Sequence, residues 1–179
     1  MPSLRRLASV ALAACVLAAL LAACASERTC SEVSLSPEAE RALGELEGRV
    51  DFVLTRPCAF ESGLEVTGVS EDSIPEQGVR HPRVSFVVGR DGRHAFTLSQ
   101  TRAVVAFRAI PTGSHWLRVA AGGVTAEGFA GPTGAGVDLA YLRWRRDGVT
   151  FELQATLGSR LAEEDVQEIV AALLESGAQ

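Results

Sequence analysis

The dipeptide Asp147-Gly148 constrains the fold of this chain more than any other local feature, because it separates two segments in which apolar and polar residues alternate. Asp-Gly favours the two-residue type I′ turn, whose twist matches that of paired antiparallel strands. With this turn, Trp144 faces Phe151 on the apolar side of the hairpin. The sequence therefore predicts a β-hairpin over Asp138–Leu157.

A second hairpin is predicted over Arg83–Gln100, around Asp91-Gly92. A two-residue turn there would pair apolar with polar residues. A three-residue loop, Arg90–Gly92, instead pairs Phe86 with Phe96 and gives one face that is apolar throughout. We therefore expect the longer loop, with Gly92 in the left-handed conformation of a turn followed by a bulge.

Two helices are predicted near the ends of the chain. Ser36-Pro37-Glu38 combines a capping hydroxyl, proline at the first helical position and an acid in the first turn, and Gly48 ends this helix. The second helix begins with the acids at 163–165, which favour the positive end of the helix dipole. Its apolar stripe needs a sheet to cover and consists of Val166, Ile169, Val170, Leu173 and Leu174.

Four further segments have strand-like apolar patterns: 50–56, 64–69, 104–109 and 116–120. Residues 71–82 are acidic and contain proline and glycine, which indicates an exposed loop. Residues 122–136 are rich in glycine and predict a mobile loop that could serve as a lid. Together these features predict an α+β fold, with an antiparallel sheet of about six or seven strands and a packing helix at each end, in a single domain over 36–179.

The N-terminus has the organisation of a bacterial lipoprotein precursor. Arg5 and Arg6 precede an apolar segment, 7–21, which is too short to span a bilayer comfortably. Leu21-Ala22-Ala23-Cys24 then places a cysteine directly after small residues. We expect residues 1–23 to be a signal peptide and Cys24 to be lipidated, with palmitate among the attached chains, so that a tether over 24–35 holds the domain at the extracytoplasmic face of the bacterial membrane.

Two alternatives to this processing exist. The letters Leu-Ala-Ala-Cys also end at Cys15, but cleavage there would leave the apolar residues 16–23 on the mature protein. Polar residues begin only after Cys24, which favours the second cysteine. The other alternative is an uncleaved anchor helix, which would also hold the protein at a membrane.

Processing at Cys24 leaves Cys30 and Cys58 as the only cysteine pair, in an oxidising compartment. We predict a disulfide between them; a redox or metal pair would need a C-x-x-C spacing or histidine companions that are absent. Loss of Arg5 and Arg6 leaves 15 basic residues against 22 acidic ones, a net charge of −7. Nucleic acid is a poor partner for that charge.

No catalytic constellation or metal or cofactor motif is recognisable. His81, His94 and His115 lack the spacing of a zinc motif, and no G-x-S-x-G elbow occurs. All 17 basic residues are arginine, so the lysine of a phosphate-binding loop is missing. We expect no metal, cofactor or catalytic residue, although paired carboxylates cannot be recognised from spacing alone.

The arginines around Trp144 resemble a site for phosphate or anionic lipid headgroups. Strand alternation, however, places Arg143 and Arg145 together on the face opposite to Trp144, with Arg143 across from Glu152. Two arginines on one sheet face are ordinary, so the structural interpretation is preferred.

The C-terminal hairpin and helix resemble a family of small extracytoplasmic domains of unknown function found in bacterial lipoproteins and in anti-sigma-factor ectodomains. The residues that carry the resemblance are Trp144, Asp147-Gly148, Phe151, Leu153 and the helix Glu163–Leu174, with an upstream echo in Val50–Pro57 and Gly63. The chain departs from the pattern at Phe60-Glu61, where that family tends to have Leu-Pro. The resemblance implies an antiparallel sheet with packed helices and a role in sensing or binding at the cell surface, and it implies no catalytic residue.

The sequence thus favours a membrane-anchored, non-enzymatic binding or sensing module whose partner is an envelope protein or an apolar ligand. The alternative is a carrier of a lipid or another apolar molecule, enclosed between sheet and helices and gated by the glycine-rich loop. An enzyme is the third and least favoured interpretation.

Overall fold

The computed structural model describes residues 30–60, 63–133, 135–158 and 161–176. The predicted signal peptide and Cys24 lie outside these residues. Ten strands and two helices follow one another in this order: β1 (Ser31–Glu32), β2 (Ser34–Leu35), α2 (Pro37–Glu47), β3 (Cys58–Ala59), β4 (Glu65–Glu76), β5 (Val79–Arg90), β6 (Arg93–Thr101), β7 (His115–Ala121), β8 (Val124–Pro132), β9 (Asp138–Arg146), β10 (Val149–Thr156) and α3 (Glu163–Ser176).

Eight strands form one sheet in the order β2-β4-β5-β6-β10-β9-β8-β7, and β1 pairs with β3 in a separate ribbon. Every pair in the large sheet is antiparallel except β2–β4, which is parallel. The predicted α+β class with a helix at each end is confirmed. The sheet has one or two strands more than expected, because segments that the sequence assigns to loops are strands.

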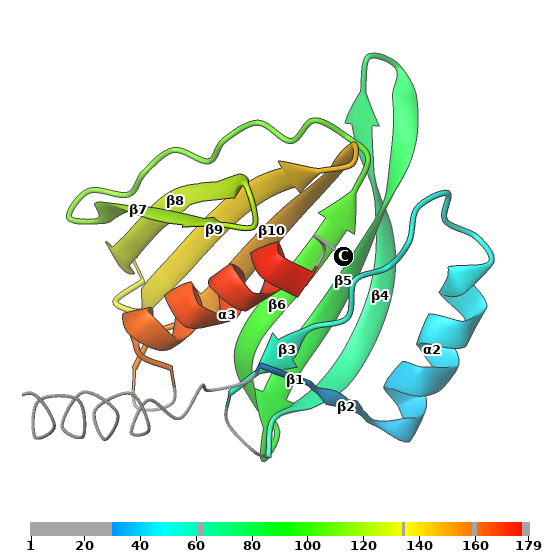
Figure 1. The fold of residues 1–179 in the computed structure, drawn as a ribbon, viewed down its shortest axis with the longest axis horizontal. Helices are drawn as coiled ribbons and strands as arrows, with labels where there is room; N and C mark the ends of the chain where they lie inside the picture. Colours follow the sequence, from blue (N-terminus) through cyan, green and yellow to red (C-terminus); the bar gives the residue numbers. More distant parts are fainter. Residues whose placement is uncertain (1–29, 61–62, 134, 159–160, 177–179) are drawn as a thin grey trace, which may run out of the picture.

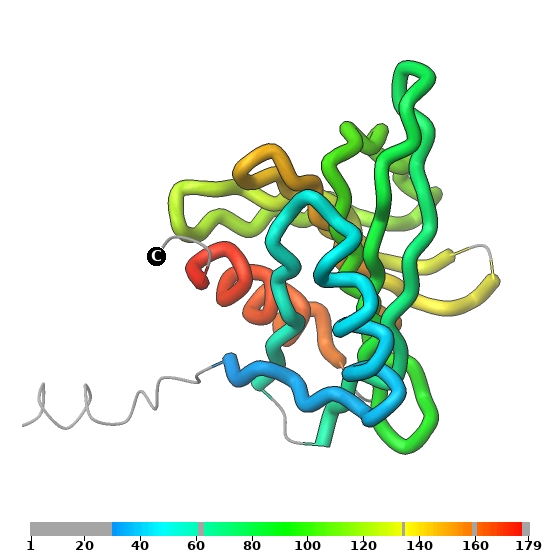
Figure 2. Tube along the Cα trace, turned by 90° about the vertical axis from the view of Figure 1, so that its right-hand side faces the viewer, coloured from blue at the N-terminus to red at the C-terminus, as the bar shows by residue number. Residues whose placement is uncertain are grey.

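Both helices share one core with the sheet. α3 lies across one sheet face with its predicted apolar stripe buried, and α2 packs beside β4 (Figure 1). Figure 2 shows the two helices on the same side of the long strands β4 and β5, and Figure 1 shows the β1–β3 ribbon between them. Among the described residues, the core extends from Val33 to Leu174.

The capping predictions are confirmed. Ser36 Oγ accepts a hydrogen bond from Ala39 N at 3.2 Å, Pro37 opens α2, and Gly48 caps its C-terminus. Among the described residues, no helix is long and apolar enough to cross a membrane.

The β9–β10 hairpin forms in the predicted register, with Trp144 opposite Phe151 and Arg143 opposite Glu152. Asp147 has φ 50° and Gly148 has φ 78°, the left-handed pair that a type I′ turn requires.

The predicted register of the β5–β6 hairpin is wrong. The turn has two residues, so Arg90 pairs with Arg93, and a bulge then shifts the pairing until Val88 faces Phe96 and Phe86 faces Leu98. The bulge restores the apolar face that a longer loop was expected to supply. A tight turn and an apolar face are therefore compatible once one strand contains an extra residue.

Residues 71–82 are not a loop but the end of the β4–β5 hairpin, which projects beyond the rest of the sheet (Figure 1). Its polar composition agrees with its exposure, since most of its side chains are exposed. Polar pairs across the strands connect it: Arg83 donates to Asp72 through Nε at 2.8 Å, and Arg80 donates to Ser73 at 2.9 Å.

The glycine-rich segment 122–136 is also mostly a strand, β8, rather than a mobile loop or lid. Gly128 allows β8 to approach β9, because a Cβ at this position would collide with the carbonyl of Tyr141. Conversely, the expected strands at 50–56 and 104–109 are irregular. Phe52 is in the core and Leu54 packs against it, whereas Val53 and Val104 are exposed.

The predicted disulfide between Cys30 and Cys58 is present, with the two Cα atoms 5.5 Å apart. It joins the β1–β3 ribbon, in which Glu32 pairs with Cys58. The start of the described chain is thereby fixed to the end of the irregular segment 50–57.

Candidate ligand cavity

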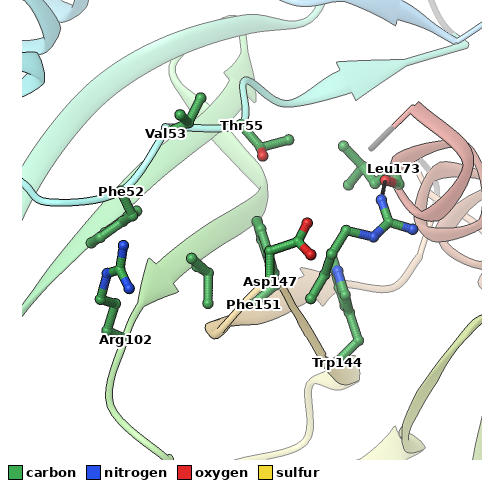
Figure 3. A pocket seen from close by; sticks show the side chains of 10 residues that line it. Phe52, Val53, Thr55, Arg102, Trp144, Asp147, Phe151 and Leu173 are labelled. Atoms are coloured by element: carbon green, nitrogen blue, oxygen red, sulfur yellow. Dashed lines mark hydrogen bonds between the residues drawn. The ribbon is translucent and has the colours of Figure 1, made fainter. Parts of the chain in front are cut away.

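A cavity of about 360 Å³ opens on the sheet face that α3 covers. It lies between the irregular segment 50–57, the C-terminal end of α3 and the β9–β10 turn (Figure 3). Its lining consists of Phe52, Val53, Thr55, Arg102, Trp144, Arg146, Asp147, Val149, Phe151 and Leu173.

The apolar floor comes from the β9–β10 hairpin. Trp144 and Phe151 stack with their ring centroids 5.2 Å apart and their planes within 2° of parallel. Both side chains are almost fully buried. Stacking across a tight hairpin holds the two rings rigidly, so this part of the lining is preformed.

One wall is the segment 50–57, which is attached to the sheet by the side chain of Gln100. Gln100 Oε1 accepts from Thr55 N at 2.8 Å, and Gln100 Nε2 donates to Thr55 O at 2.5 Å. Gln100 is fully buried. Its amide thus satisfies both backbone groups of Thr55, as a neighbouring strand would.

Arg102 connects to the beginning of the same wall. Its Nε lies 3.1 Å from Asp51 Oδ2, and its Nη2 donates to the backbone carbonyl of Asp51 at 2.6 Å. Figure 3 shows Phe52 and Arg102 next to each other on one side of the cavity, across from Leu173. This side therefore combines an aromatic ring with a guanidinium group.

The opposite side is the end of α3. Arg146 donates from Nη1 to Leu173 O at 3.4 Å and from Nη2 to Leu174 O. The last turn of α3 contains no basic residue, so this arginine on β9 satisfies carbonyls that the helix leaves free. Gly122 also contacts this end, because a Cβ there would collide with Leu174 O.

The three histidines lie apart and contribute nothing to the cavity. His81 lies 3.7 Å from Glu76, His115 lies 3.0 Å from Glu163, and His94 contacts Thr97 at 2.9 Å. Partial desolvation lowers the pKa of His94 below that of a free imidazole. The part of the chain that the structure describes contains no cluster of three or more His, Cys, Asp or Glu side chains suited to a metal ion.

Of the two arginines predicted on the other face, Arg143 is engaged in packing, whereas Arg145 is exposed and donates to Gly148 O at 3.4 Å. Arg143 donates to Val105 O, and its guanidinium lies 5.1 Å from the centre of the Phe107 ring. Its cross-strand neighbour Glu152 is buried and accepts a hydrogen bond from Tyr141. Burial, together with this bond, raises the pKa of Tyr141 well above its usual value.

Sequence analysis did not identify Gln100 and Arg102 as residues that shape a site. The sequence does contain one indication for Gln100. Phe96, Leu98 and Gln100 alternate along one strand, so Gln100 is a polar residue in the next position of the core face. A polar residue in such a position needs a buried partner. That partner, Thr55, is 45 positions away, and local pattern does not identify it.

Comparisons with protein-family models, curated proteins and solved structures found no match.

Proposed function

We propose that this chain is a membrane-anchored binding module of the bacterial cell envelope, lipidated at Cys24, whose cavity holds a small and largely apolar molecule. The observation that supports this proposal is the cavity of about 360 Å³ with a preformed aromatic floor. Small-molecule sites are typically concave, mostly apolar, and provided with a few polar groups that orient the ligand.

The volume favours a small ligand over a lipid with several acyl chains. Ligand pockets span roughly 300–1,000 Å³, and this cavity of about 360 Å³ lies near the lower limit. The glycine-rich segment that was expected to gate a lipid carrier is strand β8 and does not line the cavity. A binding or sensing role is therefore better supported than bulk lipid transport.

The position of the anchor agrees with such a role. Cys30 follows Cys24 by six positions, and six residue steps span at most about 20 Å. Because Cys30 is bonded to Cys58, the tether would be attached to the β1–β3 ribbon, which lies next to segment 50–57. A lipidated protein would thus present its cavity close to the membrane surface.

Native mass spectrometry of residues 25–179, exported to a bacterial periplasm and purified gently, tests the binding role. We expect an added mass of a small molecule that disappears on denaturation. Val53→Trp, at the exposed edge of the cavity, should remove the added mass. Val79→Trp, at the tip of the β4–β5 hairpin, is the matched control and should retain it. Retention of the mass in both variants would contradict binding in this cavity.

The anchor is tested separately in cells that express the full chain. We expect incorporation of labelled palmitate and recovery in the membrane fraction, both lost in Cys24→Ser. Cys15→Ser should change neither result. Equal labelling of the Cys24→Ser chain would contradict lipidation at that residue.

A further inference from the structure

The charged groups around the cavity are unequally available to a ligand. The lining contains two guanidinium groups, of Arg102 and Arg146, and one carboxylate, of Asp147. Arg146 holds the end of α3 with both of its terminal nitrogens. In Figure 3 the carboxylate of Asp147 is turned away from Arg102, towards the side of Leu173. The side of the cavity formed by Phe52 and Arg102 is therefore the cationic one.

Arg102 retains donors that could serve a ligand. Its Nε and Nη2 are directed to Asp51, whereas its Nη1 lies above the β9–β10 turn, 4.0 Å from the position that a Cβ of Gly148 would occupy. Among the described residues, no acceptor for this Nη1 is found. A guanidinium with an unused edge beside an apolar surface is suited to carboxylate, sulfonate or phosphate oxygens.

The present partner of Arg102 is easily replaced. The side chains of Arg102 and Asp51 are 43% and 70% exposed, and ion pairs this accessible contribute little to stability. An anion bound at the cavity edge would be partly desolvated by Phe52 and the hairpin floor. The lower effective dielectric would strengthen its attraction to Arg102, which offsets part of the cost of desolvating the anion.

We propose that the cavity selects an amphipathic anion, with its apolar body against Trp144 and Phe151 and its anionic group on Arg102. This inference rests on the proposed binding function and specifies its ligand class. A neutral molecule of the same shape should bind more weakly, because it leaves the Nη1 edge of Arg102 unpaired.

Two fluorescent probes of the same shape provide the test. Anilinonaphthalene sulfonate and N-phenylnaphthylamine share their aromatic body, and only the first is an anion. Residues 25–179 contain every core residue of the part that the structure describes and are used with Trp116→Phe. Trp116 is exposed and packs on Phe107 away from the cavity, so this change leaves Trp144 as the single reporter. Energy transfer from Trp144 measures the affinity of each probe for the domain, and the effect of Arg102→Gln shows whether the probe lies in the cavity.

We expect the sulfonate to bind about tenfold more tightly than the neutral probe, and Arg102→Gln to abolish this preference, as the loss of one charge-assisted hydrogen bond predicts. Arg118→Gln is the matched control. Arg118 lies on β7 and forms an exposed pair with Glu127 on β8, so this change removes the same charge and should leave the preference intact.

Asp51→Asn distinguishes ligand binding from a merely structural role of Arg102. If Arg102 holds the anion, loss of the competing carboxylate leaves the affinity for the sulfonate unchanged or raises it. If Arg102 only holds the segment 50–57 through Asp51, Asp51→Asn lowers the affinity for the sulfonate probe as much as Arg102→Gln does. That result would overturn the inference.

The outcomes separate the two proposals. Equal affinities for both probes, unaffected by Arg102→Gln, would overturn the anion preference. They would not contradict the proposal that the protein binds a small apolar molecule. Absence of energy transfer from Trp144 to either probe would overturn both. Circular dichroism of every variant confirms that the fold is retained.

Discussion

Gln100 forms two hydrogen bonds with the backbone of Thr55, at 2.8 Å through Oε1 and at 2.5 Å through Nε2. A single side chain thereby does for Thr55 what an adjacent strand does for a residue at a sheet edge. The bonds attach segment 50–57 to β6 without extending the sheet, and the space left beneath the segment is part of the cavity.

Gln100→Leu should therefore destabilise the fold by about 2–3 kcal/mol, because it leaves an N–H and a carbonyl of Thr55 without partners. Urea denaturation at neutral pH measures the change in the free energy of unfolding. Gln154→Leu is the control. Gln154 lies on the opposite sheet face, where its side chain accepts only from Arg108, so its loss should cost less than about 1 kcal/mol. Equal losses would contradict the role of Gln100.

The disulfide closes a loop with a sequence separation of 28. Replacing both cysteines, as Cys30→Ser with Cys58→Ser, should lower the free energy of unfolding by about 3–4 kcal/mol, because the unfolded chain gains freedom. Chemical denaturation with and without a reductant is the measurement. The reduced protein should match the double variant, and identical stability of oxidised and reduced protein would contradict this prediction.

Gly122 has φ 54° and lies against the carbonyl of Leu174, whereas its neighbour Gly123 has φ 74° and open space around it. Gly123→Ala should cost about 1 kcal/mol, the ordinary penalty of a left-handed residue. Gly122→Ala should cost at least about 2 kcal/mol more, because its Cβ must displace the end of α3. Thermal unfolding compares the two variants. Equal Tm values would show that α3 can move away freely.

Asp72 accepts hydrogen bonds from Arg83, and these bonds lower the pKa of its carboxyl group below its usual value. The resulting stabilisation is present above the unfolded-state pKa of about 4 and is lost as the pH falls through the depressed folded-state pKa. The pair is exposed, so its contribution should stay below about 1 kcal/mol.

NMR titration of the Asp72 carboxyl in the wild type and in Arg83→Gln measures this effect directly. The variant should return the pKa towards its usual value. An unchanged pKa would mean that the pair is not formed in solution.

Local sequence determined the elements whose physics is local. The Asp147-Gly148 turn set the register of β9–β10, since both turn residues must adopt positive φ and the hairpin then pairs Trp144 with Phe151. Ser36, Pro37 and Gly48 determined both ends of α2, because caps act within a few residues. The apolar stripe in the sequence of α3 correctly predicted the face of this helix that is buried.

Only the tertiary structure decided which polar or glycine-rich segments became strands. Residues 71–82 have the composition of a loop and form strands because β4 and β5 pair with each other. Gly128 lies in β8, where the close approach of the Tyr141 carbonyl on β9 leaves no room for a Cβ. The cavity depends on contacts between Gln100 and Thr55, and between Arg146 and the end of α3. These residues lie far apart in the chain, and their hydrogen bonds depend on geometry that arises only when the sheet and helices pack together.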